Sequence, residues 1–238
     1  MERQMEPCQL IERSIIKKYR KELWTPFIVA VKRYELVQAG DKIAVCISGG
    51  KDSMLLAKCM QELKRHSPTD FTLTFLCMDP GYAPRNRQKI VENAEKLNIP
   101  IEFFETDIFS SVAAMDGSPC YMCAKMRRGY LYREAQRRGC NKIALGHHYD
   151  DVVETILMSM IYGAQMQSMM PKLHSDNVPG MQLIRPLYKV RESEIIRWRD
   201  DFELEFLQCA CKFTEETQVD ASGSSNSKRR EMKELIRH

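Results

Sequence analysis

The residues most suited to chemistry form a short polar run, Ser48-Gly49-Gly50-Lys51-Asp52-Ser53. The run follows an apolar segment, Ile43–Ile47, and precedes apolar residues at helical spacing that begin at Met54. Glycines let a backbone approach phosphate oxygens closely, and the first N–H groups of a helix point at an anion. Lys51 adds a positive charge, and the two serines add hydroxyl donors. The run therefore predicts a phosphate site between a strand and a helix, rather than an ordinary Gly-Gly turn beside a solvated lysine.

This run is not a Walker A loop, because Asp52 replaces the required Ser or Thr and Val45 replaces the first glycine. It resembles instead the SGGxDS signature of the PP-loop ATP pyrophosphatases. The resemblance implies cleavage of ATP between its α- and β-phosphates. It also implies that the ATP-binding residues include Ser48, Gly49, Gly50, Lys51, Asp52 and Ser53. Asp52 is in addition a candidate ligand of Mg²⁺, with stabilisation of the helix dipole as the alternative.

Cysteines form a second group with chemical potential: a C-x-x-C pair, Cys120 and Cys123, and a distant C-x-C pair, Cys209 and Cys211. Four thiolates could bind a structural zinc, and the C-x-x-C alone could be a redox disulfide. Three cysteines could instead hold an iron–sulfur cluster and leave one iron without a protein ligand. Spacing alone favours zinc slightly over the cluster, and both over the redox pair. The remaining buried-type cysteines are expected only to pack, namely Cys46, Cys59, Cys77 and Cys140.

The composition is that of an ordinary globular protein, and 238 residues suffice for one large α/β domain with small appendages. The net charge of +4 is mildly basic, but arginines and lysines are bunched at 127–128, 137–138 and 228–230. Such bunching suits a phosphate-rich partner and equally suits solvated helix faces. We find no signal peptide or membrane-spanning run, and the nine cysteines are an odd number. We therefore expect a cytoplasmic protein that has no membrane partner and works in a reducing compartment.

The elements that must position these residues alternate between strand and helix. Strands are predicted at 42–47, 71–78, 101–105, 142–145 and 183–184, and helices at 52–64, 85–97, 150–162 and 191–201. This alternation predicts an α/β fold with a parallel sheet, in which ligands bind beyond the carboxyl ends of the strands. We expect N-terminal helices in 1–38, the nucleotide domain in 39–190, and a helical extension in 191–238. The extension would contain a linker at 220–227 and a basic helix at 228–237, whereas 164–182, rich in methionine, would form a loop over the site.

The middle of the chain, from Gly40 to Cys209, resembles the tRNA 2-thiocytidine synthetase family (TtcA). The motifs that carry this resemblance are Gly40-Asp41, Val45–Ser53, Cys120-x-x-Cys123, Arg127-Arg128-Gly129, Ala144–Asp151 with Glu154-Thr155, Met170–Leu173 and Arg185-Pro186-Leu187. The family is similar in fold to other adenine-nucleotide α-hydrolases. Its members use ATP, a [4Fe–4S] cluster and sulfur from a cysteine desulfurase to thiolate C2 of a cytidine (position 32) in the tRNA anticodon loop. They commonly form homodimers.

The resemblance also assigns roles to single residues. Cys120, Cys123 and Cys209 match the three cluster ligands. Relatives often carry Pro-Cys-x-x-Cys where this chain has Cys209-Ala210-Cys211, so Cys211 remains the alternative third ligand.

Five further residues are candidates at the same crevice. Asp150 or Asp151, together with Arg127, corresponds to a catalytic pair proposed for a related thiolase. Asp150 could instead only cap a helix. Gly146 and Asp79 are candidate nucleotide contacts, with turn formation as the alternative for Asp79. His147 and His148, from the same motif, receive no catalytic role.

Together these features predict an ATP-dependent, cluster-dependent tRNA sulfurtransferase. One alternative is a related PP-loop thiolase or desulfidase that acts on another base or a small molecule. The other alternative is a nucleotide-binding module held together by zinc, without sulfur chemistry.

Overall fold

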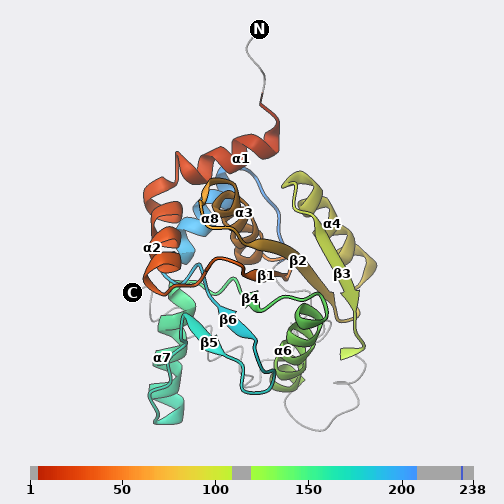
Figure 1. Cartoon of the computed structure of the whole chain (residues 1–238), viewed down its shortest axis with the longest axis vertical. Coiled ribbons are helices and arrows are strands. Elements are labelled where there is room, and N and C mark those ends of the chain that lie inside the picture. The colour runs from red at the N-terminus through yellow and green to blue at the C-terminus, as the bar shows by residue number, and fades with distance from the viewer. Residues whose placement is uncertain (1–4, 109–118, 208–231, 233–238) are drawn as a thin grey trace.

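A single sheet with the strand order β3-β2-β1-β4-β6-β5 organises the chain (Figure 1). The computed structural model describes residues 5–108, 119–207 and 232, and for residues 119–125 it gives the course of the backbone. The strands are β1 Lys42–Ile47, β2 Thr72–Asp79, β3 Ile101–Glu105, β4 Lys142–Ala144, β5 Lys172–His174 and β6 Gln182–Ile184. Neighbouring strands run parallel, apart from the antiparallel pair of β5 and β6. The predicted α/β class with a parallel sheet is confirmed.

Helices cover both faces of this sheet, because alternate side chains of a strand point to opposite sides. Ile43, Val45 and Ile47 of β1 belong to one apolar core, and Ala44 and Cys46 belong to a second core. The helical elements are α1 Pro7–Ile16, the π-helix η1 Arg20–Trp24, α2 Thr25–Arg33, α3 Lys51–His66, α4 Pro84–Lys96, α6 Pro119–Arg137, α7 Tyr149–Gly163 and α8 Glu192–Asp201. Helices α1, α2, α3 and α8 lie on the side of the first core, and α6 lies on the other side (Figure 1).

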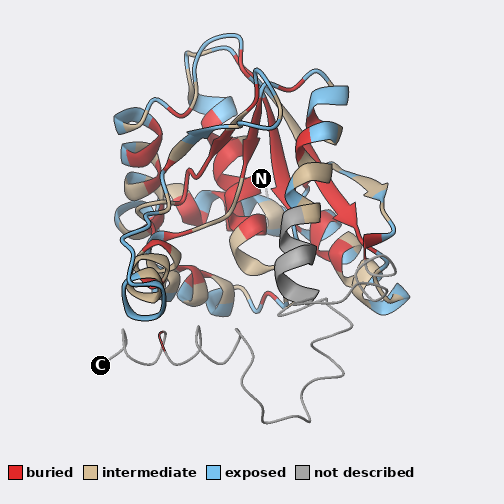
Figure 2. Cartoon of the chain, turned by 90° about the horizontal axis from the view of Figure 1, so that it is seen from below, coloured by how far each residue is buried: buried red, intermediate tan, exposed pale blue. Residues whose placement is uncertain are grey.

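Buried residues concentrate in the strands and in the helix faces that flank them (Figure 2). In the N-terminal helices, Ile11, Ile15 and Phe27 join the same core as β1 and α3. All four cysteines expected to pack are buried. Within the ranges that the structure describes, no helix combines the length and apolar character needed to cross a membrane.

Two elements are absent from the sequence predictions. Helix α6 mixes arginines, tyrosines and Gly129 around its circumference, so its sequence carries no clear apolar stripe. Strand β5 has three residues and lies in the segment predicted as a loop, where it closes the sheet edge beside β6. The predicted linker at 220–227 and the predicted helix at 228–237 lie outside the described residues, apart from residue 232.

A buried ion pair connects the amino ends of β1 and β4, at the opposite end of these strands from the site. Lys142 Nζ lies 2.6 Å from Asp41 Oδ2, and both side chains are almost fully buried. Asp41 also accepts hydrogen bonds from the backbone N–H of Gln38 and the side-chain amide of Asn141. The pair therefore joins the first residue of β4 to the turn that precedes β1.

We expect the Asp41→Ala substitution to lower the free energy of unfolding by about 3–5 kcal/mol, because it leaves the Lys142 charge buried without its carboxylate. Urea denaturation measures the change. The matched control is Asp70→Ala, which removes the carboxylate of the exposed Lys64–Asp70 pair and should cause a much smaller loss. Equal losses for the two variants would contradict a structural role for the buried pair.

Candidate functional site

The strand order places the candidate site where the chain changes direction across the sheet. From β1 the chain moves to β2 and β3 on one side, and then returns to β4 on the other side of β1. In open parallel sheets, ligands bind at such a switch point, beyond the carboxyl ends of the two strands. Ser48 follows β1 directly, and Gly146 to His148 follow β4. The two segments predicted to hold nucleotide therefore meet at this switch point, which is called the crevice below.

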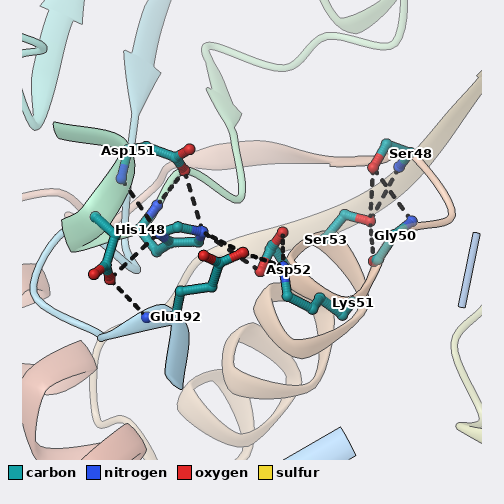
Figure 3. Close-up of polar contacts among 9 residues, drawn as sticks. Ser48, Gly50, Lys51, Asp52, Ser53, His148, Asp151 and Glu192 are labelled. Carbon is teal, nitrogen blue, oxygen red and sulfur yellow. Dashed lines mark hydrogen bonds and ion pairs between the residues drawn. The ribbon is translucent and has the colours of Figure 1, made fainter. Parts of the chain in front are cut away.

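Hydrogen bonds between its own residues fix the conformation of the loop after β1 (Figure 3). Ser53 Oγ lies 3.1 Å from both the N–H and the Oγ of Ser48, and it donates to the carbonyl oxygen of Gly50 at 2.9 Å. Gly49 has φ of +83°, and a Cβ there would lie 2.7 Å from Ile90 Cγ1, so only glycine fits. Gly50 is the N-cap of α3 and caps it with no side chain. The first N–H groups of α3 are thus available to an anion.

Lys51 sits between two carboxylates, one of which the sequence analysis missed. Its Nζ lies 3.1 Å from Asp52 Oδ2 and 3.0 Å from Glu192 Oε1 of α8 (Figure 3). Burial lowers the pKa of Lys51, but Asp52 and Glu192 outweigh burial and raise it above its ordinary value. Glu192 lies 141 residues downstream, at a helix start where an acidic residue is ordinarily explained by the helix dipole. No local signal in the sequence could have placed it beside Lys51.

His148 is the buried centre of this charged group, at 2% exposure. Its Nδ1 accepts the Asp151 backbone N–H at 3.4 Å, and Asp151 Oδ2 accepts the His148 N–H at 3.0 Å. This reciprocal cap begins α7 and leaves the other ring nitrogen, Nε2, to carry the proton. Nε2 lies 3.5 Å from Asp151 Oδ2, 3.8 Å from Asp52 Oδ1 and 3.9 Å from Glu192 Oε1. The imidazole therefore spaces three carboxylates around the start of α3.

The acidic pair after β4 serves two helices. His148, rather than Asp150, is the N-cap of α7. Asp150 instead accepts the backbone N–H of Glu192 at 2.7 Å, so it caps the start of α8. Asp52 Oδ1 is buried and has no hydrogen-bond partner among the described residues. An orphaned carboxylate oxygen of this kind is a fitting ligand for a hard cation such as Mg²⁺.

Gly146 allows the segment after β4 to touch the first turn of α3. A Cβ at this position would lie 3.0 Å from Asp52 C and 3.0 Å from Ser53 N. Only a residue without a side chain lets the two backbones approach so closely. The observed contact is therefore with the helix that begins at Lys51.

Asp79 and Arg127 lie on the β2 side of the crevice. Asp79 Oδ1 accepts the N–H groups of Gly81 and Tyr82, and its Oδ2 lies 3.2 Å from Arg87. These bonds match the turn-forming alternative for Asp79. Arg127 Nη2 donates to Tyr82 Oη at 3.2 Å. Within the described residues no ion pair joins Arg127 to Asp150 or Asp151, so the predicted catalytic pair is not in contact.

The thiols of the predicted cluster are described only in part. Cys120 and Cys123 lie one turn apart at the start of α6, whereas Cys209 and Cys211 lie outside the described residues. The part of the chain that the structure describes contains no set of three His, Cys, Asp or Glu residues arranged around a metal ion.

The segment that leads to Cys209 is attached to the nucleotide loop. The Leu207 N–H donates to the carbonyl oxygen of Gly49 at 3.2 Å, and the Asn93 side chain binds the Glu205 carbonyl oxygen. Leu207 therefore stands directly against the turn at Gly49.

Comparison with known proteins identifies the architecture. A family model described as a PP-loop domain matches residues 20–213. The chain belongs to the PP-loop family.

Within this family, the chain is similar to enzymes named tRNA-cytidine(32) 2-sulfurtransferase. The protein of that name from Acaryochloris marina is 35% identical over 216 residues, which are 90% of this chain and 76% of that protein. The Neisseria meningitidis serogroup C protein of the same name is 36% identical over 183 residues, or 76% of this chain. The PP-loop chain spans 57% of the length of that Neisseria relative. The resemblance to the TtcA family is confirmed.

A solved structure agrees with the fold. The PP-loop chain matches the U34-tRNA thiolase NcsA from Methanococcus maripaludis, solved with its [4Fe–4S] cluster, at a TM-score of 0.62 and 21% identity. The match covers 90% of this chain and 78% of the thiolase. At that identity the match shows a shared fold alone.

We expect Gly146→Ala to lower the free energy of unfolding by about 1–3 kcal/mol, because the new methyl group would meet the backbone of Asp52 and Ser53. Thermal denaturation measures the loss. The control is Gly163→Ala, since nothing lies within 4 Å of a Cβ there and stability should stay the same or rise slightly. If the two variants were equally stable, the close approach would not constrain the fold.

We expect Glu192→Gln to tighten the binding of magnesium-free pyrophosphate roughly three- to tenfold, because it removes one of two anions that neutralise Lys51. Isothermal titration calorimetry measures the dissociation constant. Glu194→Gln is the control, since Glu194 lies in the same helical turn and contacts Arg197 instead. An unchanged constant for Glu192→Gln would mean that this carboxylate does not compete with phosphate for Lys51.

Proposed function

We propose that the chain is an ATP-dependent tRNA sulfurtransferase that thiolates C2 of cytidine 32 in the anticodon loop. The single observation that supports this best is the start of α3, where no side chain caps the N–H groups and where Lys51 and Asp52 lie. It stands at a switch point shared with the segment after β4 that contains Gly146. The tRNA substrate and the modified base are inferred from the names of the relatives. Because the chain spans only part of several relatives, the whole reaction is part of the proposal.

The first half of the reaction activates the base. The O2 oxygen of cytosine attacks the α-phosphorus of ATP, and the bond to the bridging oxygen of the β-phosphate breaks, so pyrophosphate leaves. The N–H groups at the start of α3 and the Lys51 ammonium would hold that pyrophosphate, since positioning and charge neutralisation are the main requirements of this step. Asp52, through its orphaned Oδ1, would hold a Mg²⁺ ion, which would neutralise negative charge on the triphosphate.

The second half replaces oxygen by sulfur. A sulfur nucleophile bonds to C2, and the C2–O bond breaks with AMP as the leaving group. Cytosine alone resists this exchange because its carbonyl oxygen is a poor leaving group, and adenylation removes that barrier. Asp150 and Asp151 are the proposed catalytic carboxylates, with Arg127 as their basic partner. Their bonds to the helix starts would fix the carboxylates in position before the substrate binds.

A [4Fe–4S] cluster is the proposed sulfur-handling group, held by Cys120, Cys123 and Cys209. The start of α6 fits two of these roles, because residues three apart on a helix lie on one face and a helix start favours thiolates. The third ligand, Cys209, follows two residues after Leu207 in the sequence, and the Leu207 backbone N–H binds Gly49. When bound, such a cluster supplies an iron without a protein ligand that can carry sulfur.

The proposal is preferred over a zinc-stabilised binding module because relatives that match most of the chain are named as sulfurtransferases. The sulfur donor, for which a cysteine desulfurase is the expected candidate, and a homodimeric state belong to the same proposal.

The test is thiolation of an unmodified anticodon stem-loop RNA by protein purified without oxygen. Mass spectrometry of the digested RNA should detect 2-thiocytidine, and the protein should contain iron and sulfide rather than zinc. Asp52→Asn should lower the rate roughly a hundredfold, because the metal ion would lose a charged ligand. Cys123→Ser should remove both the iron and the product.

Cys8→Ser is the matched thiol control, because Cys8 lies on α1 at the far end of the molecule from α6 (Figure 1). It should retain iron content and activity. Thiolation at a base other than cytidine 32 would replace the substrate assignment, and one zinc per chain with no thiolated product would refute the enzyme.

A further inference from the structure

Arg185 is a buried cation with no carboxylate partner among the described residues. It follows β6 directly, and only 7% of the residue is exposed. Its Nη1 donates to the carbonyl oxygen of Met170, and its Nε has no hydrogen-bond partner among the described residues. Among the residues that the structure describes, no carboxylate lies within ion-pair distance of the Arg185 guanidinium. A buried charge in this state is strongly destabilising unless something compensates for it.

The surroundings make the charge more unfavourable. Burial, and then the nearby positive charge of Arg128, lower the pKa of Arg185 to about 10, so the guanidinium stays charged at neutral pH. Tyr132 lies one helical turn after Arg128 on α6, and the pKa of Tyr132 is raised by its burial. Tyr132 also belongs to one buried cluster with Leu183 of β6, so this part of α6 packs beside the strand that leads to Arg185. The two arginines therefore come from packed elements, although like charges repel. Such an arrangement is stable when an anion lies between them.

The position of this pair in the fold points to the reaction crevice. Strand β6 lies beside β4, so Arg185 leaves the sheet at the same edge as Gly146 and Ser48. Asp151, which caps α7, is near enough to affect the pKa of Arg185 electrostatically. Arg128 is exposed to solvent, so an anion can reach its guanidinium.

We propose that Arg185 and Arg128 form a second phosphate subsite, separate from the turn at Ser48–Ser53. An arginine guanidinium matches the geometry of a phosphate group, and the unpaired Nε supplies a donor in the plane of the fork. The phosphate comes from one of two sources: a phosphodiester of the RNA next to the modified nucleotide, or a phosphate of the bound nucleotide. The location at the crevice rests on the proposed function, but the binding itself does not require turnover.

The first experiment measures the thermal midpoint of the full chain as inorganic phosphate replaces chloride at constant ionic strength. A ligand that binds the folded state raises the midpoint. Arg185→Gln and Arg128→Gln should each lose a large part of the phosphate-dependent rise. The charge-matched control is Arg13→Gln on α1, where the arginine is exposed and contacts Met5 Sδ; its response should equal that of the unmodified protein.

The same variants are also made in a Lys51→Gln background, which weakens the phosphate site expected at the Ser48–Ser53 turn. A phosphate response that survives Lys51→Gln and disappears on adding Arg185→Gln supports two separate subsites. Without phosphate, Arg185→Gln should be as stable as the unmodified protein or more stable, because it removes an uncompensated buried charge.

The second experiment identifies the source of the phosphate. Binding of an anticodon stem-loop RNA and of a nonhydrolysable ATP analogue is measured for each variant. If the RNA supplies the phosphate, Arg185→Gln weakens RNA binding about tenfold or more and reduces its log–log salt slope by about 0.7 per lost contact. If the nucleotide supplies it, the analogue loses affinity by a similar factor and RNA binding is unchanged. Either result supports the subsite.

An unchanged phosphate response in both Arg185→Gln and Arg128→Gln overturns the inference. So does a large loss of stability of Arg185→Gln in chloride with the phosphate response intact, because Arg185 would then only support the Met170 segment. If Arg185→Gln does not fold, the Arg128→Gln result decides. Absence of thiolation with a normal phosphate response would refute the proposed function alone.

Discussion

The close approach of two backbones at Gly146 is the constraint on which the rest of the site depends. The segment after β4 touches the first turn of α3 with no side chain between them. This contact brings His148 and its neighbouring carboxylates to the first turn of α3, whose N–H groups receive no cap from a side chain. A side chain at position 146 would separate the cation and anions of the crevice. Glycine is therefore required at position 146 by the close approach of the two backbones, and not by a positive φ.

Charge balance differs between Lys51 and Arg185, two of the cations at the crevice. Lys51 is neutralised by Asp52 and Glu192, so this structure compensates its charge internally. Arg185 has no such partner among the described residues, although it is more deeply buried. The uncompensated charge of Arg185 creates a positive electrostatic potential that favours a negative ligand. Because the charge is already in place, binding requires no reorganisation of the protein.

The sequence was sufficient for the features that are local. Strand β1, the glycine turn and α3 follow each other within 25 residues, and their apolar pattern and turn residues define them. The ion pair of Lys51 with Glu192 could not be predicted, because it depends on the strand order and on the position of α8. The first N–H group of that helix donates to Asp150. Helix α6 escaped prediction since its apolar residues do not form one stripe, and β5 because three residues at a sheet edge carry little pattern.

A single backbone hydrogen bond, from Leu207 to Gly49, connects the nucleotide turn to the segment that continues toward Cys209. Thermodynamic linkage is reciprocal, so a ligand on one side of this bond that changes the affinity on the other side has its own affinity changed by the same factor. Under the proposed function, a chain whose thiols hold no cluster would bind its nucleotide with a different affinity. The proposed enzyme would in this way consume less ATP whenever its cluster is missing or damaged.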